Sequence, residues 1–530
     1  MQQNTISNLK TPPSSFRSTH RVKNRLQNRS FSIADDTGIS IALDHARSGV
    51  VPVRGLDLDT KIDGLLTKKS IEDLESFVAN LTQDKRFASK FIEIIETETF
   101  KNLAGKFQMT ARTTEIGASE TSTRYIHSIH SAKLFIEFSK KIGLNLETTK
   151  FTAILMLIHD IGHGPFSHTF ELALNKNPQI HYDHDSFGAQ LLQTEDLKVK
   201  IIQALNPQKD PALAKKIIPM LSDILKEQKQ PELQFFIEIK NIFDRASYLV
   251  QDIERSQFTT EEKDRDIKSV YDFLDSLSYN KELDRIVSSN KALAEDFLNL
   301  RQKLNQRMCE HPAVNIANEY ISIFINQYLE ENSLLSPCDL FQLHRISEKE
   351  ILGYLPVRFS ELFNKKVERL FEPVITIPFT YFTSDGLTEI LEDRVSDKIL
   401  NKVLEDPRFA NLNLSIEVLR ENLIIAHTGN YSKDWDIAVQ EETGETQVHT
   451  LRRRVSHNDS FLVVALRKNH FIRYDSLKSL NQIVLEAVKE LCQVDSKEDL
   501  QTKFRKLTRN AFRIYTYDQN GKFLTPSEFL

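Results

Sequence analysis

Cysteine is scarce in this sequence, with three residues among 530, namely Cys309, Cys338 and Cys492. An odd number of widely separated thiols supports neither a disulfide framework nor a zinc or iron–sulfur site built on sulfur. Reduced thiols are typical of the cytoplasm, which is the location that we expect for this chain. Any metal site must then be built from histidine and carboxylate side chains.

Long apolar runs and an excess of one charge are also missing. No charge-free apolar run of about 18 residues occurs, so we predict no membrane span. Lys and Arg number 69 and Asp and Glu number 74, and this net charge of −5 argues against a chain held on nucleic acid by its overall charge. The net charge does not exclude a local basic patch on the surface. Because single cores seldom grow beyond about 250–300 residues, we expect more than one domain.

Acidic residues are absent from the first 34 positions, which contain six Lys and Arg side chains and several serines. We predict a flexible basic segment over residues 1–60. An organellar transit peptide has a similar composition and remains the alternative interpretation.

Hydrophobic periodicity divides the rest of the chain in two. Between residues 65 and 345, apolar side chains recur at spacings of three and four, which predicts a helical bundle that we assign to residues 61–345. Beyond about residue 370, short β-type runs alternate with helical stretches, so we expect residues 346–530 to form a mixed α+β region used in oligomerisation or regulation. The predicted fold class is mainly α, a helical bundle followed by a smaller α+β region.

Histidine is concentrated in one part of the chain, since seven of the 15 lie between residues 127 and 184. The centre of this cluster is the segment from His159 to His168, where an apolar run ends in His-Asp and is followed by Gly and Pro. Such a helix end places polar side chains beside flexible backbone, where they can face one ion. Upstream, Arg124 and His127 share a helix face and offer a guanidinium for phosphate and an imidazole for a metal.

A second polar stripe follows, because Asp244, Tyr248 and Asp252 recur at intervals of four and so share one helix face. A solvated surface is the plain alternative for such a stripe. Apolar neighbours, including Leu249 and Val250, favour a partly buried position instead.

Together these segments resemble the HD-domain metal-dependent phosphohydrolases. The matching residues are Arg124-Tyr125-Ile126-His127-Ser128, His159-Asp160-Ile161-Gly162-His163-Gly164-Pro165-Phe166-Ser167-His168, and Tyr182-Asp183-His184-Asp185. The Gly-His-Gly-Pro-Phe-Ser-His extension is similar to that of the deoxynucleoside triphosphate (dNTP) triphosphohydrolases, which include bacterial dGTPases and the vertebrate dNTPase with a sterile alpha motif. The resemblance covers about residues 90–320 and implies an HD-type helical bundle.

The resemblance also implies roles for individual residues. It implies two histidines and two carboxylates as metal ligands, namely His127, His159, Asp160 and Asp244. These nitrogen and oxygen donors suit Mn, Mg, Fe, Ni or Zn ions, and the sequence does not distinguish among these metals. It implies a catalytic group in which His168 protonates the leaving oxygen and His184, oriented by Asp185 or Glu171, handles the other proton transfer. The implied substrate contacts are His163, Arg124, Arg245 and Arg301 for phosphate and Tyr248, Asp252 and Gln108 for the sugar.

The sequence departs from the family pattern at one position. The segment from Arg301 to His311 matches a family segment, but Cys309 replaces the usual aromatic residue. Base selectivity therefore stays open. His130 and His181 are interpreted as structural or surface residues, and the run from Arg452 to Arg454 as a solvated face or a phosphate contact.

The predicted activity is metal-dependent hydrolysis of a dNTP at the α-phosphorus, which releases a deoxynucleoside and inorganic triphosphate. We expect a homo-oligomer without membrane attachment, and we leave open a second, regulatory nucleotide. One alternative is another HD-type nucleotide phosphohydrolase or phosphodiesterase. The other is a non-catalytic nucleotide sensor or nucleic-acid-binding protein, which need not keep the full set of ligands.

Overall fold

The computed structural model describes two parts of the chain. The first runs from residue 65 to 352 apart from 109–121, 177–179, 207, 257, 309–311 and 335–338. The second consists of shorter segments, which are 371–378, 399–412, 414–416, 419, 423–427, 435–440, 448–453, 461–467, 474–491, 516–517 and 523–524. The predicted basic segment 1–60 and the three cysteines lie outside these residues.

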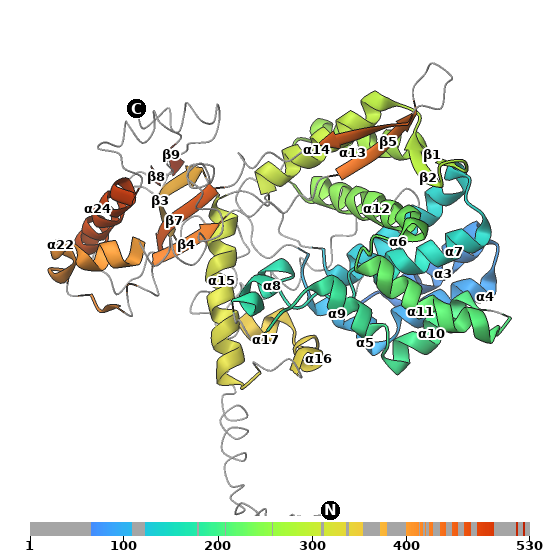
Figure 1. Cartoon of the computed structure of the whole chain (residues 1–530), viewed down its shortest axis with the longest axis horizontal. Coiled ribbons are helices and arrows are strands. Elements are labelled where there is room, and N and C mark those ends of the chain that lie inside the picture. The colour runs from blue at the N-terminus through green and yellow to red at the C-terminus, as the bar shows by residue number, and fades with distance from the viewer. Residues whose placement is uncertain are drawn as a thin grey trace, which may run out of the picture. The chain divides into compact units, whose positions relative to one another are not determined.

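The first part is helical, which confirms the predicted fold class (Figure 1). In chain order its helices are α3 (Lys68–Thr82), α4 (Lys85–Ile95), α5 (Glu98–Lys101), the 3₁₀ turn η2 (Asn102–Gly105), α6 (Arg124–Ile142), α7 (Leu146–Ile158), α8 (His168–Asn175), α9 (His184–Leu191), α10 (Glu195–Leu205), α11 (Pro211–Leu225), α12 (Pro231–Arg255), α13 (Thr260–Asp275), α14 (Lys291–Met308), α15 (Pro312–Glu331), α16 (Leu340–Leu343) and α17 (Glu348–Leu352).

Three of these helices, α6, α7 and α12, pack against one another at the centre of the bundle. Local signals in the sequence set their ends. The Thr123 hydroxyl accepts the Ile126 amide at the start of α6, and Gly143 ends it at a φ of 87° that favours glycine. Asn145 caps α7, and Pro231 occupies the first turn of α12, where its missing N–H costs nothing.

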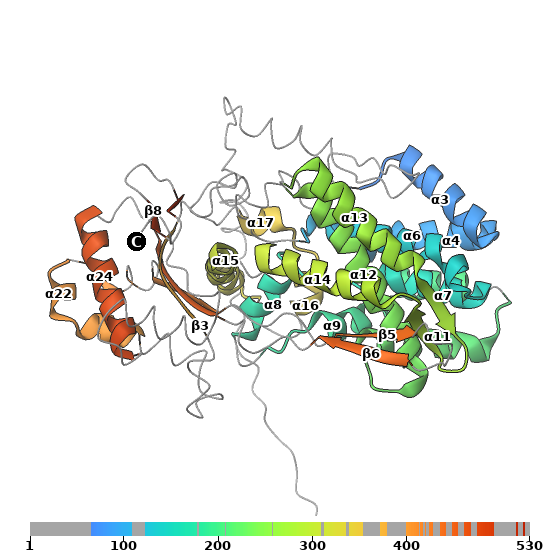
Figure 2. The same cartoon turned by 90° about the horizontal axis from the view of Figure 1, so that it is seen from above.

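A hairpin lies within the stretch that we predicted to form a helical bundle. Strands β1 (Leu277–Asn280) and β2 (Arg285–Ser288) pair antiparallel, and Asp284 between them has a φ of 48°. Strand β2 also pairs in parallel with β5 (Trp435–Gln440). Strand β5 in turn pairs antiparallel with β6 (Val448–Arg453), and Figure 2 shows these two strands side by side. The run Ile286-Val287 is β-branched, and this preference together with cross-strand pairing overrides the helical pattern around it.

The predicted β-type runs in the C-terminal third are also present. Strands β3 (Phe371–Pro378), β7 (Phe461–Arg467) and β4 (Leu423–His427) form an antiparallel sheet in that order, and β8 (Thr516–Tyr517) pairs with β9 (Phe523–Leu524). Helices α22 (Pro407–Ala410) and α24 (Tyr474–Leu491) accompany them. The residues that the structure describes include no helix long and apolar enough to cross a membrane.

Buried charge appears where α16 and α17 meet the helical bundle. Glu348 and Lys106 are both fully buried, and Glu348 Oε1 accepts the amides of Phe107 and Phe166 at 2.7 Å each. Burial raises the pKa of Glu348 to about 8, against the stabilising effect of these amides and of Lys106. Burial likewise moves the pKa of Lys106 well below its usual range.

The backbone at Gly162 lies very close to the backbone of residues 184–188. A Cβ atom there would lie 2.8 Å from Gly188 Cα and nearer still to Gly188 N and the His184 carbonyl oxygen. These are backbone atoms, which cannot rotate away. We therefore expect Gly162→Ala to lower the free energy of unfolding in urea by at least about 3 kcal/mol, at the upper end of overpacking effects.

Gly105→Ala is the control for this substitution, because its nearest contact is the side chain of Ser347 at 3.3 Å. It should change the free energy of unfolding far less. Equal effects of the two variants would contradict the close approach at Gly162.

Glu348 predicts a pH dependence of stability. Its pKa is about 8 in the folded chain and keeps its usual value of 4.5 in the unfolded chain. Between these values the folded chain keeps a proton that the unfolded chain releases, so the free energy of unfolding falls as pH rises from about 5 to 8. We expect Glu348→Gln to flatten this fall, measured by urea unfolding across the pH range.

The exposed carboxylate of Glu350 on the same helix provides the matched control, and Glu350→Gln should keep the wild-type slope. Identical slopes in the wild type and in Glu348→Gln would rule out this titration.

Candidate active site

Three predicted metal ligands from three helices converge. His127 comes from α6, His159 caps the C-terminus of α7, and Asp244 lies in the middle of α12. Asp244 Oδ1 is 3.0 Å from His127 Nε2 and 3.3 Å from His159 Nε2, and the two Nε2 atoms are 3.3 Å apart. The potential ligand atoms of all three lie within 4.8 Å of one another.

Asp160, the fourth predicted ligand, completes the group. Its Oδ2 atom lies 3.6 Å from the Nε2 atoms of both His127 and His159. Both carboxylates keep a pKa below the usual range. Burial alone would raise these values, but the charge of Arg124 outweighs it at Asp160 and the hydrogen bonds from the two imidazoles outweigh it at Asp244.

Neighbouring groups orient the imidazoles of His127 and His159. His159 Nδ1 is 2.7 Å from the carbonyl oxygen of Met156, and because a carbonyl only accepts, this nitrogen carries the proton. The Ser247 hydroxyl and the Gln251 amide lie at 3.4 and 3.5 Å from His127 Nδ1. The Nε2 atoms are thereby left to face each other and Asp244.

This arrangement fits a metal ion. With both neutral imidazoles protonated on Nδ1, two nitrogen lone pairs and a carboxylate oxygen would lie within 3.3 Å of one another, which is unfavourable unless a cation lies between them. Burial lowers the pKa of His127, which favours the neutral form that metals bind. At His159, burial is outweighed by Asp160 and Asp244, which raise its pKa and so favour positive charge at this point. Two nitrogen and two carboxylate donors suit a divalent ion.

Arg124 lies directly beside this group. Its Nη1 atom donates to Asp160 Oδ2 at 2.6 Å, and its Nε atom donates to the Ser167 hydroxyl at 3.0 Å. Both partners are buried with it, so the guanidinium is held in one orientation. The sequence prediction that Arg124 and His127 share one helix face is confirmed.

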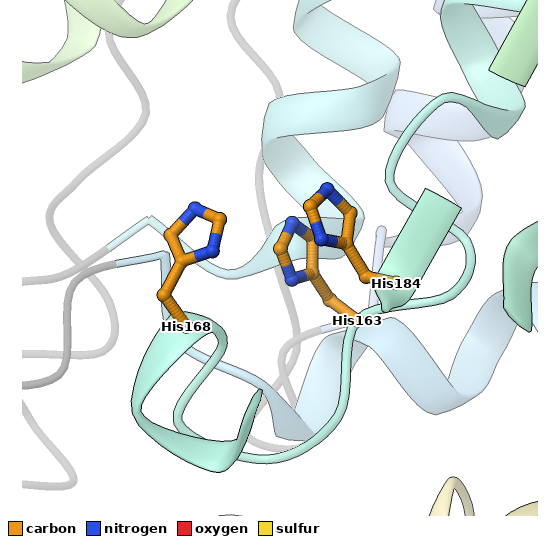
Figure 3. A group of neighbouring side chains, drawn as sticks. All are labelled: His163, His168 and His184. Atoms are coloured by element: carbon orange, nitrogen blue, oxygen red, sulfur yellow. The ribbon is translucent and has the colours of Figure 1, made fainter. Parts of the chain in front are cut away.

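Three further histidines form a second cluster next to Asp160, drawn in Figure 3. His163 Nε2 is 3.3 Å from Asp160 Oδ1, which links the two groups. Glu171 lies 2.7 Å from His168 Nδ1 through Oε2 and 2.7 Å from His184 Nδ1 through Oε1. These two imidazoles are therefore oriented by one carboxylate.

The charges in this cluster are paired. Burial opposes a positive charge on His184, but the hydrogen bond to Glu171 and the charge of Asp185 outweigh it and raise the pKa of His184. The two imidazoles in turn hold the pKa of Glu171 below its usual range despite burial. Asp185 Oδ1 lies 3.6 Å from His184 Nε2. Of the two carboxylates that the sequence offered for orienting His184, Glu171 makes the shorter contact.

The three imidazoles of this cluster have potential ligand atoms within 4.8 Å of one another. However, the rings of His163 and His184 are stacked, with centroids 3.9 Å apart and planes 13° from parallel (Figure 3). An imidazole binds a metal in the plane of its ring, so the lone pairs of two stacked rings run parallel and do not converge. The cluster is better suited to contacts with an anion and to proton transfer.

Helix α12 and helix α14 bring two more cations together. Arg301 Nε donates to the Tyr248 hydroxyl at 2.8 Å, and Tyr248 lies one turn after Asp244. Burial and the like charge of Arg301 lower the pKa of Arg245 to about 10. Two guanidinium groups that repel each other beside a candidate metal group form a suitable environment for a polyanion.

Other predicted residues have weaker positional support. Asp252 lies two turns after Asp244 along α12. The Gln108 amide donates to the Ser122 carbonyl, close to the start of α6, and its buried Oε1 atom has no hydrogen-bond partner in the described structure. His181 is exposed. Cys309, His311 and Arg454 lie outside the described residues.

Several residues that are neither predicted ligands nor predicted substrate contacts orient the site. His130, interpreted as structural, is buried with Nδ1 at 2.8 Å from the Ser247 hydroxyl and thus supports the contact to His127. Ser247 and Gln251 follow Asp244 by three and seven positions, a helical spacing that could have indicated them. No comparable spacing in the sequence indicates a role for Glu348.

Residues 124–247 match the family described as HD domain. An uncharacterized protein of Methanocaldococcus jannaschii is 26% identical over 57% of this chain, and the match spans 59% of its own length. The "Deoxynucleoside triphosphate triphosphohydrolase SAMHD1 homolog" of Dictyostelium discoideum is 23% identical over 79% of this chain and 77% of that protein.

A "Deoxyguanosinetriphosphate triphosphohydrolase-like protein" of Neorickettsia sennetsu is 33% identical over 19% of this chain and 24% of that protein. The matched residues of the family include the four predicted metal ligands and the second histidine cluster. Residues 124–247 thus form an HD domain, and the resemblance of the chain to the HD-domain deoxynucleoside triphosphate triphosphohydrolases is confirmed.

Proposed function

We propose that this protein is a metal-dependent phosphohydrolase that cleaves a dNTP into a deoxynucleoside and inorganic triphosphate. One observation carries the proposal: a buried group of two imidazoles and two carboxylates that favours a cation lies beside the buried guanidinium of Arg124. The names of the two triphosphohydrolase relatives support the substrate class.

His127, His159, Asp160 and Asp244 would hold the divalent ion. When bound there, the ion would lower the pKa of a water molecule and neutralise charge on the attacked phosphate. These carboxylates and imidazoles lie on α6 and α12 and at the C-terminal end of α7, three helices that pack together, so their positions are determined by the core of the bundle. A preorganised group of this kind loses little energy to rearrangement when substrate binds.

The cationic side chains favour a substrate with several phosphates. Arg124 lies beside the metal group and donates to Asp160. Arg245 and Arg301 repel each other near Asp244, so an oligophosphate would relieve that repulsion. His163, held by Asp160, would contact a further phosphate oxygen. A monophosphate would leave part of this positive charge unmatched, which favours a triphosphate over a nucleoside monophosphate as substrate.

His168 and His184 would carry the proton transfers. Attack of water at the α-phosphorus breaks the bond to the 5′ oxygen, which must gain a proton to leave as the hydroxyl of the deoxynucleoside. His168 stands at the first turn of α8 with half of its side chain exposed, and its Nδ1 atom lies 2.7 Å from Glu171 Oε2. His184 shares that carboxylate, so both imidazoles keep their Nδ1 atoms on Glu171 and present their Nε2 atoms.

Tyr248 and Asp252 would meet the sugar from α12, with Gln108 as a further contact. The Tyr248 hydroxyl is already held by Arg301, which fixes the ring. A fixed ring under the sugar would exclude a 2′-hydroxyl and thereby favour a deoxyribonucleotide.

The products distinguish this activity from other reactions of an HD domain. Purified protein should be incubated with Mn²⁺ and single dNTPs, then with dNTP mixtures, and the products separated by ion-exchange chromatography. We expect deoxynucleoside and intact triphosphate in equal amounts, because cleavage occurs at the α-phosphorus. Monophosphate with pyrophosphate, or hydrolysis of cyclic dinucleotides alone, would contradict the proposal. Turnover in mixtures alone would reveal a regulatory nucleotide.

Removal of one ligand charge should release the metal. Asp244→Asn keeps the shape of the side chain but removes its charge, so we expect metal affinity to fall by at least about 10–100-fold, with loss of turnover. Metal content after dialysis is measured by mass spectrometry. Glu232→Gln, at an exposed position on the same helix, is the matched control and should keep both metal and activity. Full metal content in Asp244→Asn would exclude this residue as a ligand.

A further inference from the structure

Glu348 connects α17 to two separate segments of the active site. It is fully buried, and its Oε1 atom accepts the Phe107 and Phe166 amides at 2.7 Å each. The residue lies about a hundred positions beyond the matched HD family region, which ends at residue 247. One oxygen thus holds two backbone segments that are far apart in the sequence.

The Phe166 segment needs such a constraint. Phe166 and Ser167 have φ angles of 62° and 50°, in the left-handed region that residues with a Cβ atom seldom adopt. Such a conformation persists where the surroundings determine it. Here the Phe166 amide is held by Glu348, and the Ser167 hydroxyl donates to the Phe107 carbonyl at 2.9 Å.

The two segments held by Glu348 position the phosphate-facing side chains. The Ser167 hydroxyl accepts the Arg124 Nε–H, and the Arg124 amide donates to the Lys106 carbonyl at 2.8 Å. His168 follows Ser167 directly and begins α8. A shift of the backbone at Phe166 would therefore move both the guanidinium and the imidazole.

A second contact from the same part of the chain holds the other end of this loop. His344 Nε2 lies 2.8 Å from the Ile161 carbonyl oxygen, to which it must donate. Burial and the charge of Lys106 lower the pKa of His344 well below its usual range, so the imidazole is neutral. Two side chains of residues 339–352 thus form hydrogen bonds with the loop, His344 at Ile161 and Glu348 at Phe166.

We propose that Glu348 is a positioning residue of the phosphohydrolase site: by accepting the Phe107 and Phe166 amides on one oxygen, it fixes the backbone that presents Arg124 and His168 to the substrate. The inference rests on the proposed function for its catalytic consequence. The position of the acceptor oxygen, more than its charge, is what the site requires. Lys106 and Arg124 are the charged groups that act on this carboxyl.

Three substitutions separate the position of the acceptor oxygen from the titration of the carboxyl group. Glu348→Gln keeps a carbonyl oxygen at the same distance and removes the titrating carboxyl group, Glu348→Asp keeps a carboxyl group and withdraws the oxygen by one methylene, and Glu348→Ala removes the acceptor. We expect kcat to fall by about 10²-fold in the Ala variant, the effect of a small displacement of catalytic groups. The Asp variant should fall in the same direction, and the Gln variant should retain most of kcat. Metal content should stay unchanged in all three.

Hydrogen exchange gives a readout that needs no turnover. Amide exchange in a peptide covering residues 162–170 should accelerate in the Ala and Asp variants and stay close to wild type in the Gln variant. Affinity for inorganic triphosphate in the presence of Mn²⁺, measured by calorimetry, should weaken in the same order, because Arg124 loses its support. Glu350→Gln, on the exposed side of α17, should match wild type in every measurement.

These readouts keep the two proposals distinguishable. If the wild type hydrolyses no dNTP, the proposed function fails, and the exchange and triphosphate affinity still decide the role of Glu348. Wild-type exchange and affinity in Glu348→Asp would overturn the positioning role, as would a Gln variant as impaired as the Asp variant. Should Glu348→Ala fail to fold, the comparison between Asp and Gln carries the test.

Discussion

The site depends on one electrostatic constraint, the close approach of two imidazole nitrogens. His127 and His159 present Nε2 atoms 3.3 Å apart, and Asp244 adds an oxygen to the same small volume. Positive charge, on a bound ion or on a protonated imidazole, makes that approach favourable in a buried setting. Three helices, α6, α7 and α12, must pack correctly for it to occur, so the core of the bundle and the cation requirement of the site are determined together.

Part of this group carries a local signal in the sequence. His159-Asp160 occupies a helix end and Arg124 and His127 share one face, whereas the full set of four ligands, with Asp244 on another helix, came from the family resemblance. The pairing of these helices is favoured by their apolar faces, which also follow from the sequence. Strands beyond residue 370 could be predicted for a similar reason, since runs of β-branched residues favour strands by themselves.

Prediction failed where a contact joins distant positions without a pattern. Glu348 is separated from Phe166 by 182 residues, and a single glutamate in a helical stretch is indistinguishable from a surface residue until the fold buries it. The hairpin of β1 and β2 was missed because four-residue strands are too short to stand out among helices. Its second strand also pairs with β5, far along the chain. The stacking of His163 on His184 also follows from the close approach of two backbones at Gly162 and Gly188.

The parallel pairing of β2 with β5 affects how the chain can be divided. Val287 and Ser288 lie opposite Ala438 and Val439, so the edge of a hairpin inside the helical region is covered by a strand from the C-terminal third. A fragment that ends at residue 345 would expose the amides and carbonyls of that edge to solvent. Exposed edges pair readily with other chains. A truncated protein would carry every proposed metal ligand and still expose β2 to self-association, so a shortened form is a poor substitute for the intact chain in biochemical work.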